Sequence, residues 1–137
     1  MTNYLLDTNA LIAVLRQGSR SPVAAKMRLH SGSLVTSMLV AEELYRGAWR
    51  SRRPEANLAA VDALLAAVPP LDFGRDDARE AGRIDAQLAN AGMRIGPFDT
   101  LIAAQALFRR LTLVTHNIRE FSRIDALTLE DWQITPT

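Results

Sequence analysis

The sequence contains no cysteine, and this absence closes several functional classes at once. Without a thiol the chain can form no disulfide, no cysteine nucleophile and no cysteine-based zinc site. Redox chemistry by the chain's own side chains is not expected either. The chemistry of this protein therefore has to come from carboxylates, hydroxyls, amides and the two histidines.

Long apolar runs are also missing. No window approaches the roughly 18 uninterrupted apolar residues of a membrane span. The first ten residues lack the basic start and long apolar core of a signal peptide. We therefore expect a cytoplasmic protein with no membrane partner.

An excess of either charge is lacking, because 16 lysines and arginines face 15 acids and give a net charge of +1. Nothing global draws such a chain to nucleic acid, so any electrostatic footprint must be local. Lysine occurs once, at Lys26, and arginine supplies the other basic residues. The arginines at 46, 50, 52 and 53 suit phosphate contacts, but they equally suit a solvated rim, and a GC-rich genome produces the same bias.

Hydrophobic residues make up 48% of the 137 residues, enough for one core, so we expect a single domain over 1–137. The apolar spacing predicts a strand that ends at Asp7, strands at 33–37 and 111–115, and weaker ones at 71–73 and 127–129. Helices are predicted between them, at 10–16, 23–30, 38–50, 55–67, 76–91 and 98–111. This alternation predicts an α/β fold, with a small parallel sheet covered by helices on both sides.

Three acids stand where such a sheet binds ligands, at the carboxyl ends of its strands. Asp7 ends the first strand, Glu43 lies on the helix that leaves the second, and Asp99 begins the helix before the strand at 111–115. Carboxylates gathered this closely repel one another unless a cation compensates. Mg²⁺ or Mn²⁺ prefers such oxygen ligands, and Thr8, Asn9 or Ser37 could support them.

Each acid also has an ordinary interpretation. Asp7 is a good helix cap, Asp99 suits a helix first turn, and Glu43 could face water. The histidines, His30 and His116, allow a metal-free mechanism in which one is the acid and the other the base. His30 is more simply explained as the cation at a helix end. The residues alone leave these alternatives open.

Four segments in order, "LLDTN", "AEELYRG", "GPFDTLIAAQA" and "LVTHNIREF", resemble the PIN domain and, within it, the VapC-type toxins of bacterial toxin-antitoxin pairs. The resemblance covers essentially the whole chain, and "RRPEANL" and "REFSRIDALTLEDW" resemble the enteric plasmid branch. It implies a homodimeric, Mg²⁺-dependent endoribonuclease toxin that cleaves RNA, with initiator tRNA as the substrate suggested by this branch. It also implies a cognate VapB-like antitoxin whose amphipathic tail inhibits the toxin, and contact with DNA only through that antitoxin.

Carried over by position, the resemblance makes Asp7 and Asp99 the metal ligands. Gly47 selects Glu43 over its neighbour Glu42 as the third acid. Many family members carry a fourth acid where this chain has Asn117. Either Asn117 is a neutral ligand or Glu120 reaches the site from the next turn, and a single ion is the preferred arrangement.

Further roles follow from the same resemblance. Side chains that support the ligands or touch the substrate are expected at Thr8, Ser37, Thr115 and His116. A groove for the antitoxin tail is expected along the first and third helices, lined by Leu11, Leu15, Tyr45 and Trp49. The alternative function is a PIN-fold binding or regulatory module that has lost catalysis, and Asn117 is the feature that favours it.

Overall fold

A computed structural model describes residues 2–134, and its centre is a five-stranded sheet. The strands pair in the order β3-β2-β1-β4-β5, and all four pairings are parallel. Their bounds are β1 (Tyr4–Leu6), β2 (Leu34–Ser37), β3 (Pro70–Leu71), β4 (Thr112–Val114) and β5 (Leu129–Glu130). The predicted parallel sheet is confirmed, although β3 is shorter than predicted and β5 lies two residues later.

Helices connect all successive strands, and all but the short α7 between β4 and β5 were predicted. They are α1 (Thr8–Gln17), a 3₁₀ turn at Gly18–Arg20, α2 (Pro22–Leu29), α3 (Met38–Trp49), α4 (Pro54–Ala67), α5 (Arg75–Asn90), α6 (Pro97–Phe108) and α7 (Ile118–Phe121). The first helix begins two residues earlier than predicted, because Asp7 caps it and extends it to Thr8. The predicted helix 98–111 ends at Phe108, where the next two residues turn the chain into β4.

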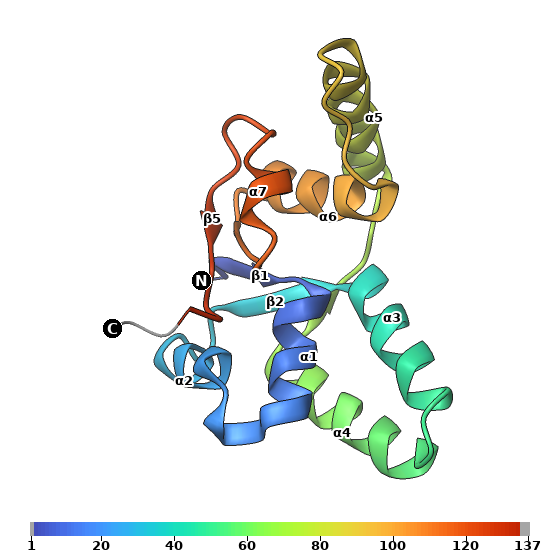
Figure 1. The fold of residues 1–137 in the computed structure, drawn as a ribbon, viewed down its shortest axis with the longest axis vertical. Helices are drawn as coiled ribbons and strands as arrows, with labels where there is room; N and C mark the ends of the chain where they lie inside the picture. Colours follow the sequence, from blue (N-terminus) through green and yellow to red (C-terminus); the bar gives the residue numbers. More distant parts are fainter. Residues whose placement is uncertain (1, 135–137) are drawn as a thin grey trace.

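The helices form two layers, with α1 to α4 on one face of the sheet and α5 to α7 on the other (Figure 1). Strand order explains the division: β1, β2 and β3 follow one another toward one edge, whereas β4 and β5 follow on the other side of β1. Right-handed crossovers that run toward β3 place their helices on one face, and those that run toward β5 place theirs on the other. The order therefore reverses between β1 and β4, and ligands of open α/β sheets bind at the carboxyl end of such a switch point.

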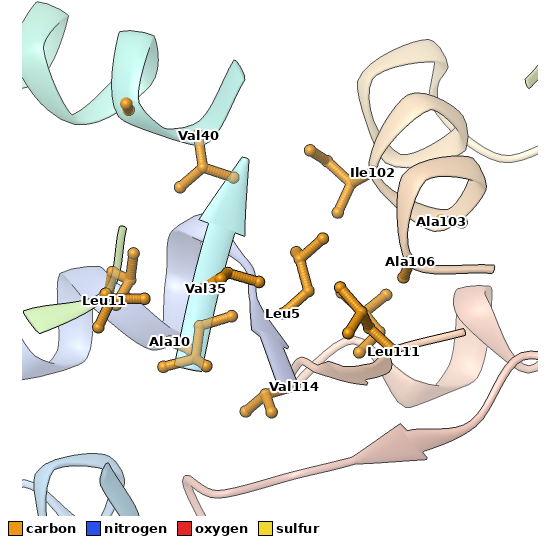
Figure 2. Close-up of a cluster of buried hydrophobic side chains, with 14 of the residues drawn as sticks. Leu5, Ala10, Leu11, Val35, Val40, Ile102, Ala103, Ala106, Leu111 and Val114 are labelled. Carbon is orange, nitrogen blue, oxygen red and sulfur yellow. The ribbon is translucent and has the colours of Figure 1, made fainter. Parts of the chain in front are cut away.

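The core lies on both faces of the central strand. Leu5 and Leu6 of β1 are fully buried, as expected for a parallel strand covered on both sides. Figure 2 shows Leu5 between Val35 of β2 and Ile102 of α6. This packing makes β1 the fixed element from which the residues after it are positioned.

The long helix α5 projects from the body of the molecule and is held at its base (Figure 1). The Gly74 backbone N–H donates to Asp77 Oδ2 at 2.8 Å, which caps the helix. Asp77 is 1% exposed, and its carboxylate also pairs with Arg109 at the end of α6. At the far end Gly92 adopts a φ of +68°, and the Met93 N–H bonds back to the Leu88 carbonyl. Across residues 2–134, every helix is too short or too polar to cross a bilayer.

Candidate functional site

Polar side chains follow three adjacent strands at one level of the sheet. Leu6, Val114 and Glu130 are register partners on β1, β4 and β5. The next residues along the chain are Asp7, Thr115 and Asp131. These three therefore meet at the carboxyl edge, beside the switch point.

Asp7 is the most buried acid of this edge, with 8% exposure. The Ala10 backbone N–H donates to its Oδ1 at 2.9 Å, so the predicted helix cap is present. Burial raises the pKa of Asp7 to about 6, the negative charges of Asp99 and Asp131 add to this rise, and hydrogen bonds from Thr115 and Ala10 oppose it. Every charge that acts on this pKa is negative, so the described surroundings leave the carboxylate uncompensated.

Asp99 lies in the first turn of α6, where Gly96 and Pro97 start the helix. Burial raises its pKa, and the negative charges of Glu120 and Glu43 raise it further. The structure thus brings Asp7, Glu43 and Glu120 within electrostatic range of Asp99. They come from four different elements, α3, α6, α7 and the end of β1.

Glu43 and Glu42 point to different surroundings. Thr8 Oγ1 donates to Glu43 Oε1 at 3.2 Å, which ties Glu43 to the residue after Asp7. Glu42 is exposed and pairs with Arg46 one turn along the helix, at 2.8 Å. The geometry therefore favours Glu43 for the site and leaves Glu42 on the outer face of α3.

Two buried hydroxyls fix the loops that carry the acids. Ser37 is fully buried and accepts the Leu39 N–H at 3.1 Å, which caps α3 and orients Glu43's helix. Thr115 is 1% exposed, hydrogen-bonds Asp7, and accepts the Asn117 N–H at 3.0 Å. Both hydroxyls act on the backbone around the acids, which agrees with a supporting role.

The two candidates for the fourth ligand differ in their surroundings. Asn117 precedes α7, and its side chain does not cap that helix. Glu120 lies within α7 and is the charge that raises the pKa of Asp99 most. The electrostatics favour Glu120 as the residue that adds a fourth negative charge.

Asp131 is a further acid at this edge, and the sequence pattern alone did not single it out. The side chain is 8% exposed, and its Oδ2 lies 2.8 Å from His116 Nδ1. Its Oδ1 accepts the Gln133 backbone N–H at 2.9 Å. The signal that could have found Asp131 is the one used for Asp7, an acid directly after a strand, but the predicted strand ended one residue too early, at Leu129.

The histidine pair is not supported by the contacts. His30 packs in an aromatic cluster, with its ring centroid 4.6 Å from that of Tyr4 and 5.4 Å from that of Trp132. His116 instead pairs with Asp131. Each histidine therefore has its own partner.

The predicted antitoxin groove is divided by α3. A cavity of about 380 Å³ between α1, α3 and α4 contains Leu15 and reaches Glu43. A second, of about 620 Å³, follows the outer face of α3 and contains Tyr45 and Trp49. The prediction for Leu11 was wrong: this side chain is fully buried in the core and lines neither cavity, because it faces the sheet.

The donor set at the strand ends fits a hard divalent cation. It consists of carboxylate and hydroxyl oxygens, and the charges acting on Asp7 are all negative. Within residues 2–134, no three or more carboxylates and histidines form a group that could hold an ion by themselves. An ion at this edge would be held by Asp7 and Asp99, with waters and phosphate oxygens filling the remaining positions, as Mg²⁺ prefers.

Comparison with known proteins identifies the class of protein that has this fold and these acids at the carboxyl edge of the sheet. The sequence pattern of the PIN domain matches residues 4–127. A tRNA(fMet)-specific endonuclease VapC from Shigella flexneri is 38% identical over 132 residues, which are 96% of this chain and 99% of the relative. Ribonuclease VapC2 from Haemophilus influenzae is 36% identical over the same shares.

Solved structures agree. The DNA-bound VapBC complex from Salmonella typhimurium matches with a TM-score of 0.91 at 36% identity, covering 96% of this chain and 99% of that one. VapBC2 from Rickettsia felis, bound to a promoter DNA fragment, matches with a TM-score of 0.86 at 31% identity over the same shares. The chain belongs to the PIN-domain family, as a member of its VapC branch.

Proposed function

We propose that this protein is the toxin of a type II toxin-antitoxin pair and acts as a metal-dependent endoribonuclease. The observation that carries the proposal is the set of acids at the switch point: among the described residues, the charges that act on Asp7 and Asp99 are all negative, and they include Glu43 and Glu120. The VapC relatives named for RNA cleavage support the reaction class. Initiator tRNA is the proposed substrate, because the Shigella flexneri relative is named for it.

Asp7 and Asp99 are the proposed metal ligands, and Mg²⁺ is the proposed ion, with Mn²⁺ able to replace it. When bound, the ion supplies charge that polarises the scissile phosphate and stabilises the leaving oxygen. Glu120 is the preferred fourth acid, with Asn117 as the alternative.

Glu43 is the proposed general base. Its Oε1 is held by the Thr8 hydroxyl at 3.2 Å, which leaves Oε2 to orient a water and accept its proton. Ser37 and Thr115 keep the backbone around these acids in place through the hydrogen bonds described above.

A cognate antitoxin is the proposed inhibitor, and its amphipathic tail would lie in the cavity between α1, α3 and α4 that contains Leu15 and reaches Glu43. Homodimerisation is proposed as well. Contact with DNA is expected only through the antitoxin, since the DNA-bound relatives are toxin-antitoxin complexes.

The proposal is tested by incubating the purified protein with initiator tRNA and total RNA, with Mg²⁺, with chelator, and as the Asp99→Asn variant. Cleavage should require the ion and be lost in the variant. RNA cleavage that persists in the presence of chelator would rule out the metal-dependent mechanism. A protein that binds Mn²⁺ yet cuts no RNA would favour the alternative function, a binding module, to which the neutral Asn117 points.

A further inference from the structure

The pair formed by His116 and Asp131 has no part in the mechanism proposed above, although it lies beside it. Asp131 directly follows β5, at the level of Asp7, and its charge acts on the pKa of Asp7. His116 follows Thr115, which hydrogen-bonds Asp7. The pair therefore borders the same edge of the sheet.

The two partners differ sharply in exposure. Asp131 is 8% exposed at its side chain, and both of its oxygens are engaged, one by His116 and one by the Gln133 N–H. The His116 side chain is 62% exposed. A buried, doubly bonded carboxylate thus holds an open imidazole in one orientation, which is how carboxylates position functional histidines elsewhere.

The contact also sets the tautomer of the ring. A carboxylate can only accept, so the proton of a neutral His116 lies on Nδ1, and Nε2 keeps its lone pair. Within the described part of the chain Nε2 bonds to no protein group, so it is free to accept a hydrogen bond from a ligand.

We propose that His116, positioned by Asp131, contacts the RNA substrate beside the scissile phosphate by accepting a hydrogen bond at Nε2. This inference rests on the proposed nuclease function. The ribose 2′-hydroxyl is the donor that every RNA nucleotide offers and DNA lacks. A base N–H is the other source of the same chemistry. His116 is then a specificity-determining residue, and Asp131 is its positioning residue.

The alternative explanation is that the pair has only a structural role and holds the end of β5 against the end of β4. Two variants separate this tie from a substrate contact. Glutamine at 116 places its amide near the position of Nε2, whereas asparagine places it near Nδ1. His116→Asn can therefore keep the hydrogen bond to Asp131 but loses the hydrogen bond to the RNA. His116→Gln can keep the hydrogen bond to the RNA. Asp125→Ala, at an exposed acid, serves as the control.

The experiment measures kcat and KM on a short synthetic RNA that spans a cleavage site of the wild-type protein. The same RNA is prepared with a single 2′-deoxynucleotide on either side of the scissile phosphate. For the wild-type protein, one of the two 2′-deoxynucleotides should raise KM about three- to tenfold, which is the effect expected from the loss of one neutral hydrogen bond. A similar rise in KM on the all-ribose RNA is expected for three variants, His116→Ala, His116→Asn and Asp131→Ala. For these variants the deoxy RNA should have the same KM as the all-ribose RNA, and kcat should change little.

Asp125→Ala should behave like the wild type, and His116→Gln should keep the discrimination against the deoxy RNA that His116→Ala loses. A KM effect of His116→Ala that disappears with a base analogue lacking its N–H, rather than with the deoxy sugar, would assign the donor to the base. Wild-type discrimination that persists in His116→Ala would overturn the inference while the nuclease function stands. A wild-type protein that cleaves no RNA would end both proposals.

Discussion

At the residue scale, the helix cap formed by Asp7 and its proposed role as a metal ligand place opposite demands on its carboxyl group. As a helix cap it accepts the Ala10 N–H, which either the carboxylate or a neutral amide could do. As a metal ligand it must be ionised although it is buried among other acids, and this raises its pKa to about 6. The metal-free protein therefore carries a destabilising charge at neutral pH.

Asp7→Asn should stabilise the metal-free protein above about pH 6 while abolishing RNA cleavage. The folded protein binds the Asp7 proton more tightly than the unfolded chain, so this group contributes stability below its ordinary pKa of 3.8. That stability is lost as the pH rises through about 6, and the loss approaches about 3 kcal/mol. Urea unfolding in chelator at pH 4 and pH 8 measures it.

Asparagine keeps the cap and removes the charge, so the unfolding free energy of the variant should be higher than that of the wild type at pH 8 by about 1–3 kcal/mol. Asp125→Asn, at an exposed acid, should change little. An Asp7→Asn protein less stable than the wild type at pH 8 would contradict the buried-charge account.

The adjacent acids Glu42 and Glu43 provide a matched comparison at the same scale. Glu43→Gln should lower the rate of RNA cleavage by about a hundredfold or more, the usual effect of losing a general base. Glu42→Gln should leave the rate within about twofold, because it breaks only an exposed ion pair with Arg46. Single-turnover cleavage measures both, and equal losses would show that the choice of Glu43 is wrong.

At the scale of elements, the site is made by the ends of parallel strands and the starts of the helices after them. Register places Asp7, Thr115 and Asp131 at one level, and capping by Asp7 and Ser37 sets the direction in which α1 and α3 leave. An ion pair with one buried partner joins α5 to the end of α6, since Arg109 binds both oxygens of the buried Asp77 and the Asp72 carbonyl.

Arg109→Ala should lower the free energy of unfolding by roughly 3 kcal/mol, because it leaves the buried Asp77 carboxylate unpaired. Arg94→Ala is the control: Arg94 makes the same kind of paired contact with Asp85, but both groups are exposed. That change should cost no more than about 1 kcal/mol. Chemical unfolding compares the two, and similar losses would contradict the role given to burial.

At the scale of the whole molecule, metal binding and folding should be coupled through the acids of the site. Mg²⁺ should raise the melting temperature, with a gain of about 2.7 kcal/mol at a hundredfold excess over its dissociation constant. The gain should be larger at pH 8 than at pH 5, since ligation requires deprotonated carboxylates. Differential scanning fluorimetry measures it.

Asp7→Asn and Asp99→Asn should each lose most of this stabilisation by Mg²⁺, whereas Glu42→Gln should retain it. The same gain in all three variants would place the ion elsewhere. Because the readout is thermal, it is independent of RNA cleavage.

Much of the fold was predictable because it depends on local patterns. Buried parallel strands read as short apolar runs, and capping and helix-breaking residues mark most helix ends, so β1, β2, β4 and six of the helices were placed within a few residues. The edge strands β3 and β5 were misplaced because two residues carry no periodic signal. The division of the expected antitoxin groove into two cavities by α3 could not be predicted. Whether a side chain on a helix is exposed depends on which neighbouring element covers that side of the helix.

The sequence by itself determined the class of fold, its family and the acids that bear on the chemistry, because those depend on residue types in a fixed order. The tertiary structure decided how those residues meet. It sets the burial and the raised pKa of Asp7, separates Glu43 from Glu42, places Leu11 in the core, and brings Asp131 to His116. Strand register and burial arise from contacts between segments far apart in the chain, which no local pattern encodes.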